Sequence, residues 1–390
     1  MTRRLMLLLA IALTGASLFA IAPSAMAARG MEVAVQDDFA MVLGIPKKTS
    51  RTTGLNLAKG LNASWIRANV TWSYVVNKYK KLKKAPKTIN YNWSGYDTLI
   101  RQAALKGIHV QLALTGPAPA WATGNHKVGV DRPNAGAFKA FAQAAAEHFR
   151  LLSVTRYSIW NEPNHRGWIS PVSKGPSLYR GLYMNGYAAI KAADPSAQVL
   201  IAETSPFELG KKGSNAMAPL KFLRGVTCAK TNYKRARKCA TLKTDGFAHH
   251  PYDFRHKVTY KYPGKDNVTL ATLSRLTSAL TKLKNAKLLT TPSGGVPNVY
   301  LTEYGYLGSG QYKLSESKRG SYLVQAFNLA QKNSRVKQML QFILIKPSSK
   351  YIFFDTSVAS RSGSPGGAYK KLAAWAKKAA AGGRIAAAKP

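Results

Sequence analysis

Residues 157–168 read YSIWNEPNHRGW, in which an apolar, strand-like run ends at the pair Asn161-Glu162 and a proline. Proline has no amide hydrogen to offer a neighbouring strand, so the run is expected to stop at Pro163. The chain has only 16 acidic residues against 58 basic ones, so a carboxylate in this position calls for a reason. The stretch predicts a buried strand that presents Glu162 at its tip.

Apolar runs of this kind recur along the chain and alternate with stretches of helical spacing. The strand candidates are residues 41–45, 63–70, 108–114, 156–160, 198–202, 246–250, 298–301 and 338–345. The helix candidates are residues 55–61, 96–106, 135–151, 177–193, 219–226, 270–283, 316–332 and 367–378. Strands that alternate with helices predict parallel βαβ units. Eight such units predict an α/β fold, a (β/α)8 TIM barrel that forms a single domain over residues 28–375.

An open, doubly wound sheet is the competing α/β architecture. It would require a glycine-rich phosphate loop after the first strand, whereas residues 45–48 read IPKK. The barrel is therefore the favoured prediction.

Residues 1–27 have the features of a secretory signal peptide. A basic start at residues 2–4 precedes an almost unbroken apolar run over residues 5–22, and residues 25–27 read AMA, as at a cleavage site. The run is long enough for a membrane anchor, but the Ala-x-Ala ending favours cleavage. We expect a secreted, extracellular protein with no membrane span after cleavage. Residues 376–390 read as a basic, low-complexity tail.

Two cysteines and a net charge of +42 limit the classes of function. In an exported protein, Cys228 and Cys239 are expected to form one local disulfide, and no other cysteine remains for a thiolate metal site. The charge suits contact with an acidic glycan or a cell-wall polymer, and no nucleic-acid motif accompanies it. We expect a monomer with no metal and no cofactor.

The acidic residues are few enough to place one by one. Catalytic groups of a (β/α)8 barrel lie at the C-terminal ends of its strands. Four carboxylates fall at such positions: Glu162, Glu203, Asp253 and Glu303. Of these, Glu203 is assigned a structural role. Asp37 and Asp38 fall in the segment before the first predicted strand.

Glu162 and Glu303 follow the fourth and seventh predicted strands, which face each other across the barrel mouth. Two carboxylates that converge on one cleft are what glycoside hydrolysis requires. One donates a proton to the leaving oxygen, and the other attacks the anomeric carbon or activates a water molecule. The pair predicts a glycosidase, whereas either glutamate alone could equally form a salt bridge or a helix cap.

Residues 160–163, WNEP, resemble the acid/base motif of the clan A retaining glycoside hydrolases, and residues 301–305, LTEYG, resemble the nucleophile strand of that clan. Within the clan the chain is most similar to the family 39-like and family 5-like enzymes. The resemblance implies that Glu162 is the general acid/base and Glu303 the nucleophile. It also implies that Asn161 binds the sugar 2-hydroxyl.

Further residues follow from the same resemblance. Arg67, in WIRANVTW, matches the arginine that orients the nucleophile. His250 and Tyr252 match the His-x-Tyr element of the sugar site, and residues 116–121, GPAPAW, resemble the loop after the third strand. The chain departs from the clan at Lys346, where an aromatic or acidic residue is expected after the eighth strand.

Aromatic residues just past the strand ends are candidates for sugar stacking or for ordinary loop packing. They are Trp72, Trp121, Trp168, Tyr304 and Tyr306. His126, Lys127 and Arg166 fall in loops at the same end and could meet an acidic sugar.

The expected function is that of an exported retaining glycoside hydrolase acting on a poly- or oligosaccharide by double displacement. A transglycosylase would use the same site with a sugar acceptor in place of water. A non-catalytic carbohydrate- or cell-wall-binding protein would exploit the basic surface.

Overall fold

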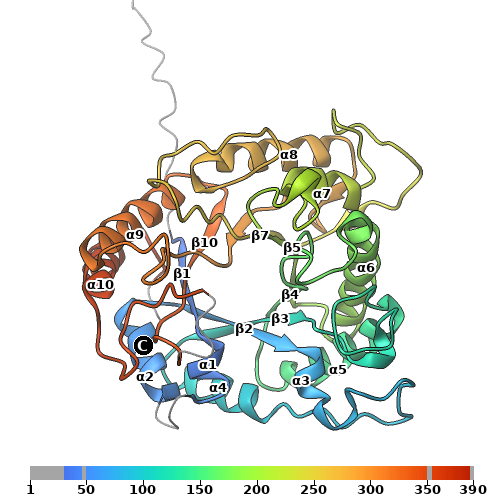
Figure 1. Ribbon diagram of the computed structural model, residues 1–390, viewed down its shortest axis with the longest axis horizontal. Helices are drawn as coiled ribbons and strands as arrows, with labels where there is room; N and C mark the ends of the chain where they lie inside the picture. The colour runs from blue at the N-terminus through green and yellow to red at the C-terminus, as the bar shows by residue number, and fades with distance from the viewer. Residues whose placement is uncertain (1–29, 46–49, 349–353, 387–390) are drawn as a thin grey trace, which may run out of the picture.

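The computed structural model describes residues 30–45, 50–348 and 354–386, which form a closed barrel of eight parallel strands surrounded by helices (Figure 1). The strand order around the barrel is β1-β10-β9-β7-β5-β4-β3-β2. The strands are β1 Glu32–Gln36, β2 Trp65–Thr71, β3 His109–Thr115, β4 Arg156–Ile159, β5 Gln198–Thr204, β7 Gly246–His249, β9 Val299–Leu301 and β10 Val336–Phe342. The predicted TIM barrel is confirmed.

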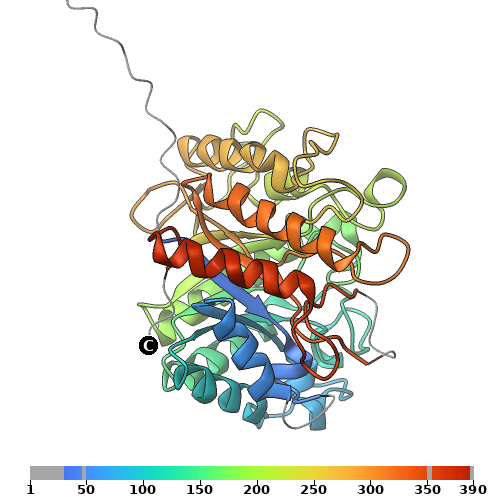
Figure 2. The same ribbon diagram turned by 90° about the vertical axis from the view of Figure 1, so that its left-hand side faces the viewer.

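Helices cover the outside of the barrel and follow the predicted alternation. They are α1 Asp38–Met41, α2 Ser50–Gly60, α3 Trp72–Val75, α4 Ser94–Ala104, α5 Ala135–Arg150, α6 Gly175–Ala193, α7 Pro219–Val226, α8 Leu273–Asn285, α9 Glu316–Gln331 and α10 Gly367–Ala381. The last two, in orange and red, run side by side across one face of the barrel (Figure 2). Within the described ranges, no helix is both long enough and apolar enough to cross a bilayer.

The prediction of the first strand is wrong. Residues 41–45 do not form a strand; β1 lies earlier, over EVAVQ, and its backbone pairs with β2 and β10. The Asp37 side chain accepts a hydrogen bond from Ala40 N at 3.0 Å and so caps α1, which ends at Met41. The apolar residues Met41 and Val42 are buried by helix packing instead of by strand pairing.

Two boundaries near the C-terminus also differ from the prediction. Strand β10 ends at Phe342, three residues before the predicted end. Helix α10 continues to Ala381 across the predicted tail boundary at residue 375, and Ile385 forms a β-bridge with Met31. Part of the predicted tail is therefore packed against the rest of the protein, since Ala379 and Ile385 are buried. Residues 1–27 and 387–390 lie outside the described residues.

The ion pair between Arg156 and Glu32 closes the barrel interior at the N-terminal ends of the strands. Arg156 on β4 donates a hydrogen bond to Glu32 on β1 at 2.7 Å, and its guanidinium lies 3.8 Å and 4.8 Å from the ring centres of Trp65 and Tyr300. This arrangement fills the N-terminal end of the barrel. The open end is therefore the C-terminal one.

The predicted disulfide is present between Cys228 and Cys239, with a Cα separation of 6.4 Å. It lies in the connection from α7 to β7. Strand β6, Leu242–Lys243, is in the same connection and pairs with β8, Leu289–Thr290. Connections that lead from a helix into a barrel strand lie at the N-terminal face, so this insertion is at the end of the barrel opposite to the predicted site.

Candidate active site

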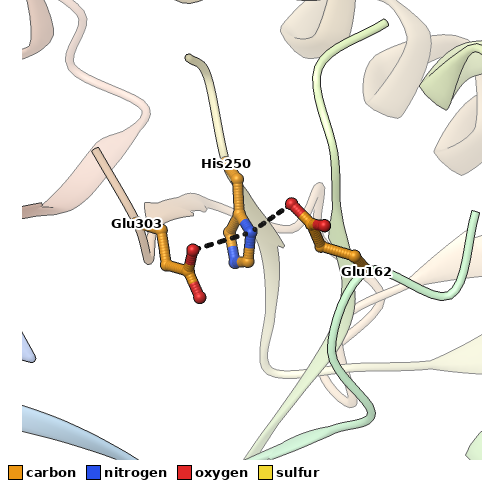
Figure 3. Close-up of side chains that lie close together, drawn as sticks. All are labelled: Glu162, His250 and Glu303. Atoms are coloured by element: carbon orange, nitrogen blue, oxygen red, sulfur yellow. Dashed lines mark hydrogen bonds and ion pairs between the residues drawn. The ribbon is translucent and has the colours of Figure 1, made fainter. Parts of the chain in front are cut away.

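Glu162 and Glu303 converge at the C-terminal mouth of the barrel (Figure 3). Glu162 follows β4 and Glu303 follows β9, and one carboxylate oxygen of each lies within 4.8 Å of the other. The backbone at Trp160 and Glu162 has positive φ angles of 67° and 37°, so the chain turns sharply as the strand ends. Glu162 N donates to the Glu203 carbonyl at 3.0 Å, which fixes this turn against β5.

His250, which directly follows β7, lies between the two carboxylates (Figure 3). Its Nδ1 is 3.1 Å from Glu162 Oε1 and 3.6 Å from Glu303 Oε2, and its Nε2 is 2.7 Å from Glu203 Oε2. Burial lowers the pKa of His250, but the surrounding carboxylates outweigh burial and raise it to about 9. At neutral pH the imidazolium donates from both nitrogens.

Arg67 on β2 contacts four side chains at the base of the site. It is buried, and it donates to Glu303 Oε1 at 2.9 Å and to Asn161 Oδ1 at 2.6 Å. It also contacts Glu203, with Nη2 3.0 Å from Oε2, and donates to Gln36 Oε1. Because the Asn161 oxygen is engaged, its amide nitrogen is the group available to a substrate hydroxyl.

Glu203 is completely buried and supports the site from β5. A register shift between Ala202 and Thr204 marks a bulge, and Glu203 itself has a φ of 49°. Burial raises the pKa of this carboxyl, but Arg67 and His250 outweigh burial and lower the pKa to about 2. Thr302 Oγ1 donates a further hydrogen bond at 2.7 Å. Glu203 is therefore a permanent anion that holds its two cationic neighbours.

Glu303 accepts a hydrogen bond from the Tyr252 hydroxyl at 3.2 Å. Burial raises the pKa of Glu303, while the positive charges of His250 and Arg67 oppose that rise. Burial and the carboxylates also raise the pKa of Tyr252 well above 10, so its hydroxyl stays protonated and can donate.

The carboxylates open into a cavity of about 320 Å³. Its lining comprises Asn69, Asn161, Glu162, His165, Trp168, Ser205, Pro206, Phe207, Leu209, Tyr252, Phe254, Glu303, Phe342 and Phe354. The predicted residues Asn161, Glu162, Trp168, Tyr252 and Glu303 thus meet in one place. Arg67 and His250 contact them from behind.

Three of the predicted aromatic contacts are not in the cavity. Trp72 is 1% exposed and stacks on Phe141, with ring centres 5.2 Å apart, because it opens α3 and points toward α5. Tyr304 is buried behind Tyr252, with ring centres 6.0 Å apart. Trp121 is half-buried but does not line the cavity.

Tyr306 and the three basic loop candidates are also outside the lining. Tyr306 packs edge-on against Tyr304, with ring centres 5.8 Å apart. His126, Lys127 and Arg166 do not border the cavity.

Several lining residues were not predicted from the sequence. Asn69 is two residues beyond Arg67 on β2, and alternation along a strand could have indicated that both face inward. Its Oδ1 is buried without a hydrogen-bond partner, so it is a candidate contact for a substrate hydroxyl.

The aromatic residue expected after the eighth barrel strand is absent at Lys346, but Phe342, the last residue of β10, lines the cavity. Lys346 lies beyond the end of β10, and its Nζ is 3.8 Å from Asp355 Oδ2.

Glu162, His250 and Glu303 are close enough together to offer three atoms to one cation. His250 Nδ1 faces carboxylate oxygens of Glu162 and Glu303, and the protonated imidazole that the raised pKa of His250 favours has no free electron pair for a metal. We interpret the group as a hydrogen-bonded charge cluster.

A parallel eight-stranded barrel with two opposed glutamates at its C-terminal mouth defines a glycoside hydrolase barrel of clan A. A family model described as Cellulase (glycosyl hydrolase family 5) matches residues 26–334, and the chain belongs to this family. No protein among those with curated records matches the chain in sequence.

Several solved structures share the fold at low identity. A family 39 glycoside hydrolase from Bacteroides cellulosilyticus WH2 has a TM-score of 0.62 and 16% identity over 89% of this chain, which spans 64% of that chain. The exo-beta-1,4-mannosidase Op5Man5 from Opitutaceae bacterium strain TAV5 has a TM-score of 0.57 and 13% identity, over 94% of this chain and 63% of that one. The virulence factor SghA, solved with its substrate analog salicin, has a TM-score of 0.58 and 13% identity, over 89% and 95%.

Proposed function

We propose that the protein is an exported retaining glycoside hydrolase in which Glu303 is the nucleophile and Glu162 the general acid/base. The observation that carries the proposal is the short approach of the two carboxylates, whose nearest oxygens lie within 4.8 Å. Retaining enzymes hold their carboxyl groups about 5–5.5 Å apart, whereas inverting enzymes need about 6.5–9.5 Å to admit a water molecule between carboxylate and sugar.

In the first step Glu303 attacks the anomeric carbon and the glycosidic bond breaks. Glu162 protonates the departing oxygen, so the leaving group is released as an alcohol and a covalent glycosyl-enzyme forms. Glu162 Oε1 accepts from His250, so the transferred proton is placed on Oε2. The ion pair with Arg67 and the hydrogen bond from Tyr252 aim the Glu303 carboxylate.

In the second step a water molecule enters on the Glu162 side. Glu162, now ionised, removes its proton, and the water oxygen attacks the anomeric carbon while the bond to Glu303 breaks. The two inversions together retain the anomeric configuration. Asn161, with its oxygen held by Arg67, directs its amide nitrogen at the sugar 2-hydroxyl.

Export is supported by the signal-like residues 1–27 and by the disulfide between Cys228 and Cys239. The mature protein is proposed to act outside the cell as a monomer on a carbohydrate substrate.

Turnover by the full mature protein should be measured on a panel of polysaccharides, oligosaccharides and simple glycosides. Glu303→Ala tests the proposed nucleophile, and Glu147→Ala, which removes a glutamate on the surface of α5, is the matched control. Turnover that survives in Glu147→Ala and disappears in Glu303→Ala supports the proposal. Equal turnover in both variants would refute it.

A further inference from the structure

One side of the active-site cavity, next to Glu162, is built from the loop after β4 and the loop after β5. Asn164 joins these loops: its Nδ2 donates to the Ser205 carbonyl at 3.2 Å, and its Oδ1 accepts from Ser205 N at 2.9 Å. Bridges from His165 and Leu209 to Ala216 hold the same loops together. This side is a fixed wall.

The fixed wall is apolar. Trp168, Phe207 and Leu209 line the cavity here, and Leu209 is 39% exposed. Phe207 is half-buried and rests on Tyr262, with ring centres 4.7 Å apart and planes 10° from parallel. Apolar surface left in contact with water is a favourable place for an apolar ligand group, because binding removes that surface from water.

The cavity also lacks the cations that the net charge of +42 suggests. Among the described residues that line it, none is a lysine or an arginine. Arg67 lies behind the lining, fully engaged with Glu203, Glu303 and Asn161. An acidic sugar would therefore meet no lysine or arginine in the described lining, in which His165 is the histidine.

Polar groups are scarce on the Glu162 side. Besides Glu162, the described lining residues with polar side chains in these two loops are Asn161, which is assigned to the sugar 2-hydroxyl, His165 and Ser205, and the indole N–H of Trp168 is one further donor. His165 Nδ1 already accepts a hydrogen bond from Gly167 N at 3.1 Å. A second sugar unit would carry several hydroxyls, and leaving them without partners in a closed site is unfavourable.

The leaving group of a glycosidase lies on the side of the acid, because the acid protonates the oxygen that departs. We propose that the natural substrate is a glycoside whose aglycone is an apolar alcohol, aryl or alkyl, seated against Trp168, Phe207 and Leu209. This inference rests on the proposed function. The reaction releases the free sugar and the apolar alcohol, which takes its proton from Glu162, and water supplies the oxygen of the new sugar hydroxyl.

Benzyl and methyl glycosides of one sugar test this directly. Both leaving groups are unactivated alcohols, so a difference in kcat/KM reports mainly on binding of the apolar group. Glucose, mannose and xylose should be tried in both anomeric forms, together with the matching glycosyl fluorides, which have no aglycone. The wild-type protein should favour benzyl over methyl by at least about 10-fold in kcat/KM.

The variants Phe207→Ser and Leu209→Ser should each reduce this ratio several-fold, and turnover of the fluoride reports whether the catalytic carboxylates still function. Leu105→Ser is the matched control, because Leu105 is 87% exposed on the outside of the barrel after α4. Leu209→Ser is tested beside Phe207→Ser because Phe207 also packs on Tyr262, so a change at Phe207 alone would not separate the loss of cavity surface from the loss of that packing.

Equal kcat/KM for benzyl and methyl glycosides, or a clear preference for a disaccharide of the same sugar, would overturn the inference while leaving a glycosidase in place. An unchanged ratio in both serine variants would also overturn it. No turnover of any glycoside or fluoride would overturn the proposed function and the inference with it.

Discussion

Nε2 of His250 lies 2.7 Å from Oε2 of Glu203, and neither side chain is exposed to solvent. The opposite ring nitrogen of His250 faces Glu162 and Glu303. A carboxylate on β5 that does not line the cavity therefore orients the imidazolium between the two carboxylates that do. We therefore expect Glu203 to act as a positioning residue, in line with the structural role predicted for it from the sequence.

Glu203→Gln should lower kcat by about 10- to 100-fold and leave KM within a few-fold of the wild-type value. The amide keeps the shape but removes the charge that holds His250 and Arg67, so the imidazole becomes less basic and less well oriented. Steady-state kinetics and a titration of His250 by NMR would check both effects. Glu208→Gln, an exposed glutamate five residues further on, serves as control. A wild-type kcat in Glu203→Gln would contradict the positioning role.

Stability should depend on pH through His250. Its pKa is about 9 in the folded protein and about 6.5 when unfolded. The folded state therefore binds the proton more tightly, and this contribution to stability is fully present below about pH 6.5 and is lost as the pH rises through 9. Asp37 and Asp38, whose pKa values burial raises to about 6, titrate at lower pH.

Urea unfolding between pH 7 and 9 should therefore show the free energy of unfolding falling with pH, by at most about 1.4 kcal/mol per pH unit from this group. His250→Gln should lack this part of the slope, whatever its absolute stability. Parallel slopes for the two proteins would show that His250 is not charged in the fold.

Arg67→Met should destabilise the protein by about 3–5 kcal/mol, because it removes one of the two cations that the buried Glu203 and Glu303 share and leaves them with His250 alone. Urea unfolding measures the loss, and turnover should fall together with stability. Arg101→Met, an exposed arginine on α4, should change the free energy of unfolding by less than about 0.5 kcal/mol. An Arg67→Met protein as stable as the wild type would mean that the buried carboxylates find other compensation.

Glu162→Ala should lose most of its turnover on alkyl glycosides, whose leaving groups need a proton. It should lose less on glycosyl fluorides, which do not. Added azide should restore part of the rate and give a glycosyl azide, since the second step no longer has its general base. Chromatography of the products would detect the glycosyl azide. Full activity of Glu162→Ala on alkyl glycosides would remove this residue from the acid/base role.

The barrel could be predicted because most of its strands are short apolar runs between amphipathic helices. Strand β1 was missed because it begins with Glu32 and ends with Gln36, which leaves only three apolar residues in it, and because a more apolar run follows it. That error placed Asp37 and Asp38 before the barrel, whereas they follow β1 at the C-terminal face. Asp38 Oδ1 accepts from Asn69 N at 3.1 Å, next to the cavity.

The charged centre of the site was predictable for a different reason. Glu162 and Glu303 were placed by strand ends, and the ends of parallel strands must meet at one mouth. Arg67 and His250 were placed by the resemblance to clan A. Phe207, Phe254 and Phe354 come from long loops after strands, whose course no periodicity describes. Trp72 was misassigned because a residue just past a strand end can turn outward into a helix, as α3 does.

The stereochemistry of the first product tests the central claim most directly. Hydrolysis of a glycoside of known anomeric form should be followed by proton NMR from the first turnovers, before the free sugar equilibrates. The separation of Glu162 and Glu303 predicts that the sugar is released with the anomeric configuration of the substrate. Release of the opposite anomer would show a single displacement and would contradict the role of Glu303 as a covalent nucleophile.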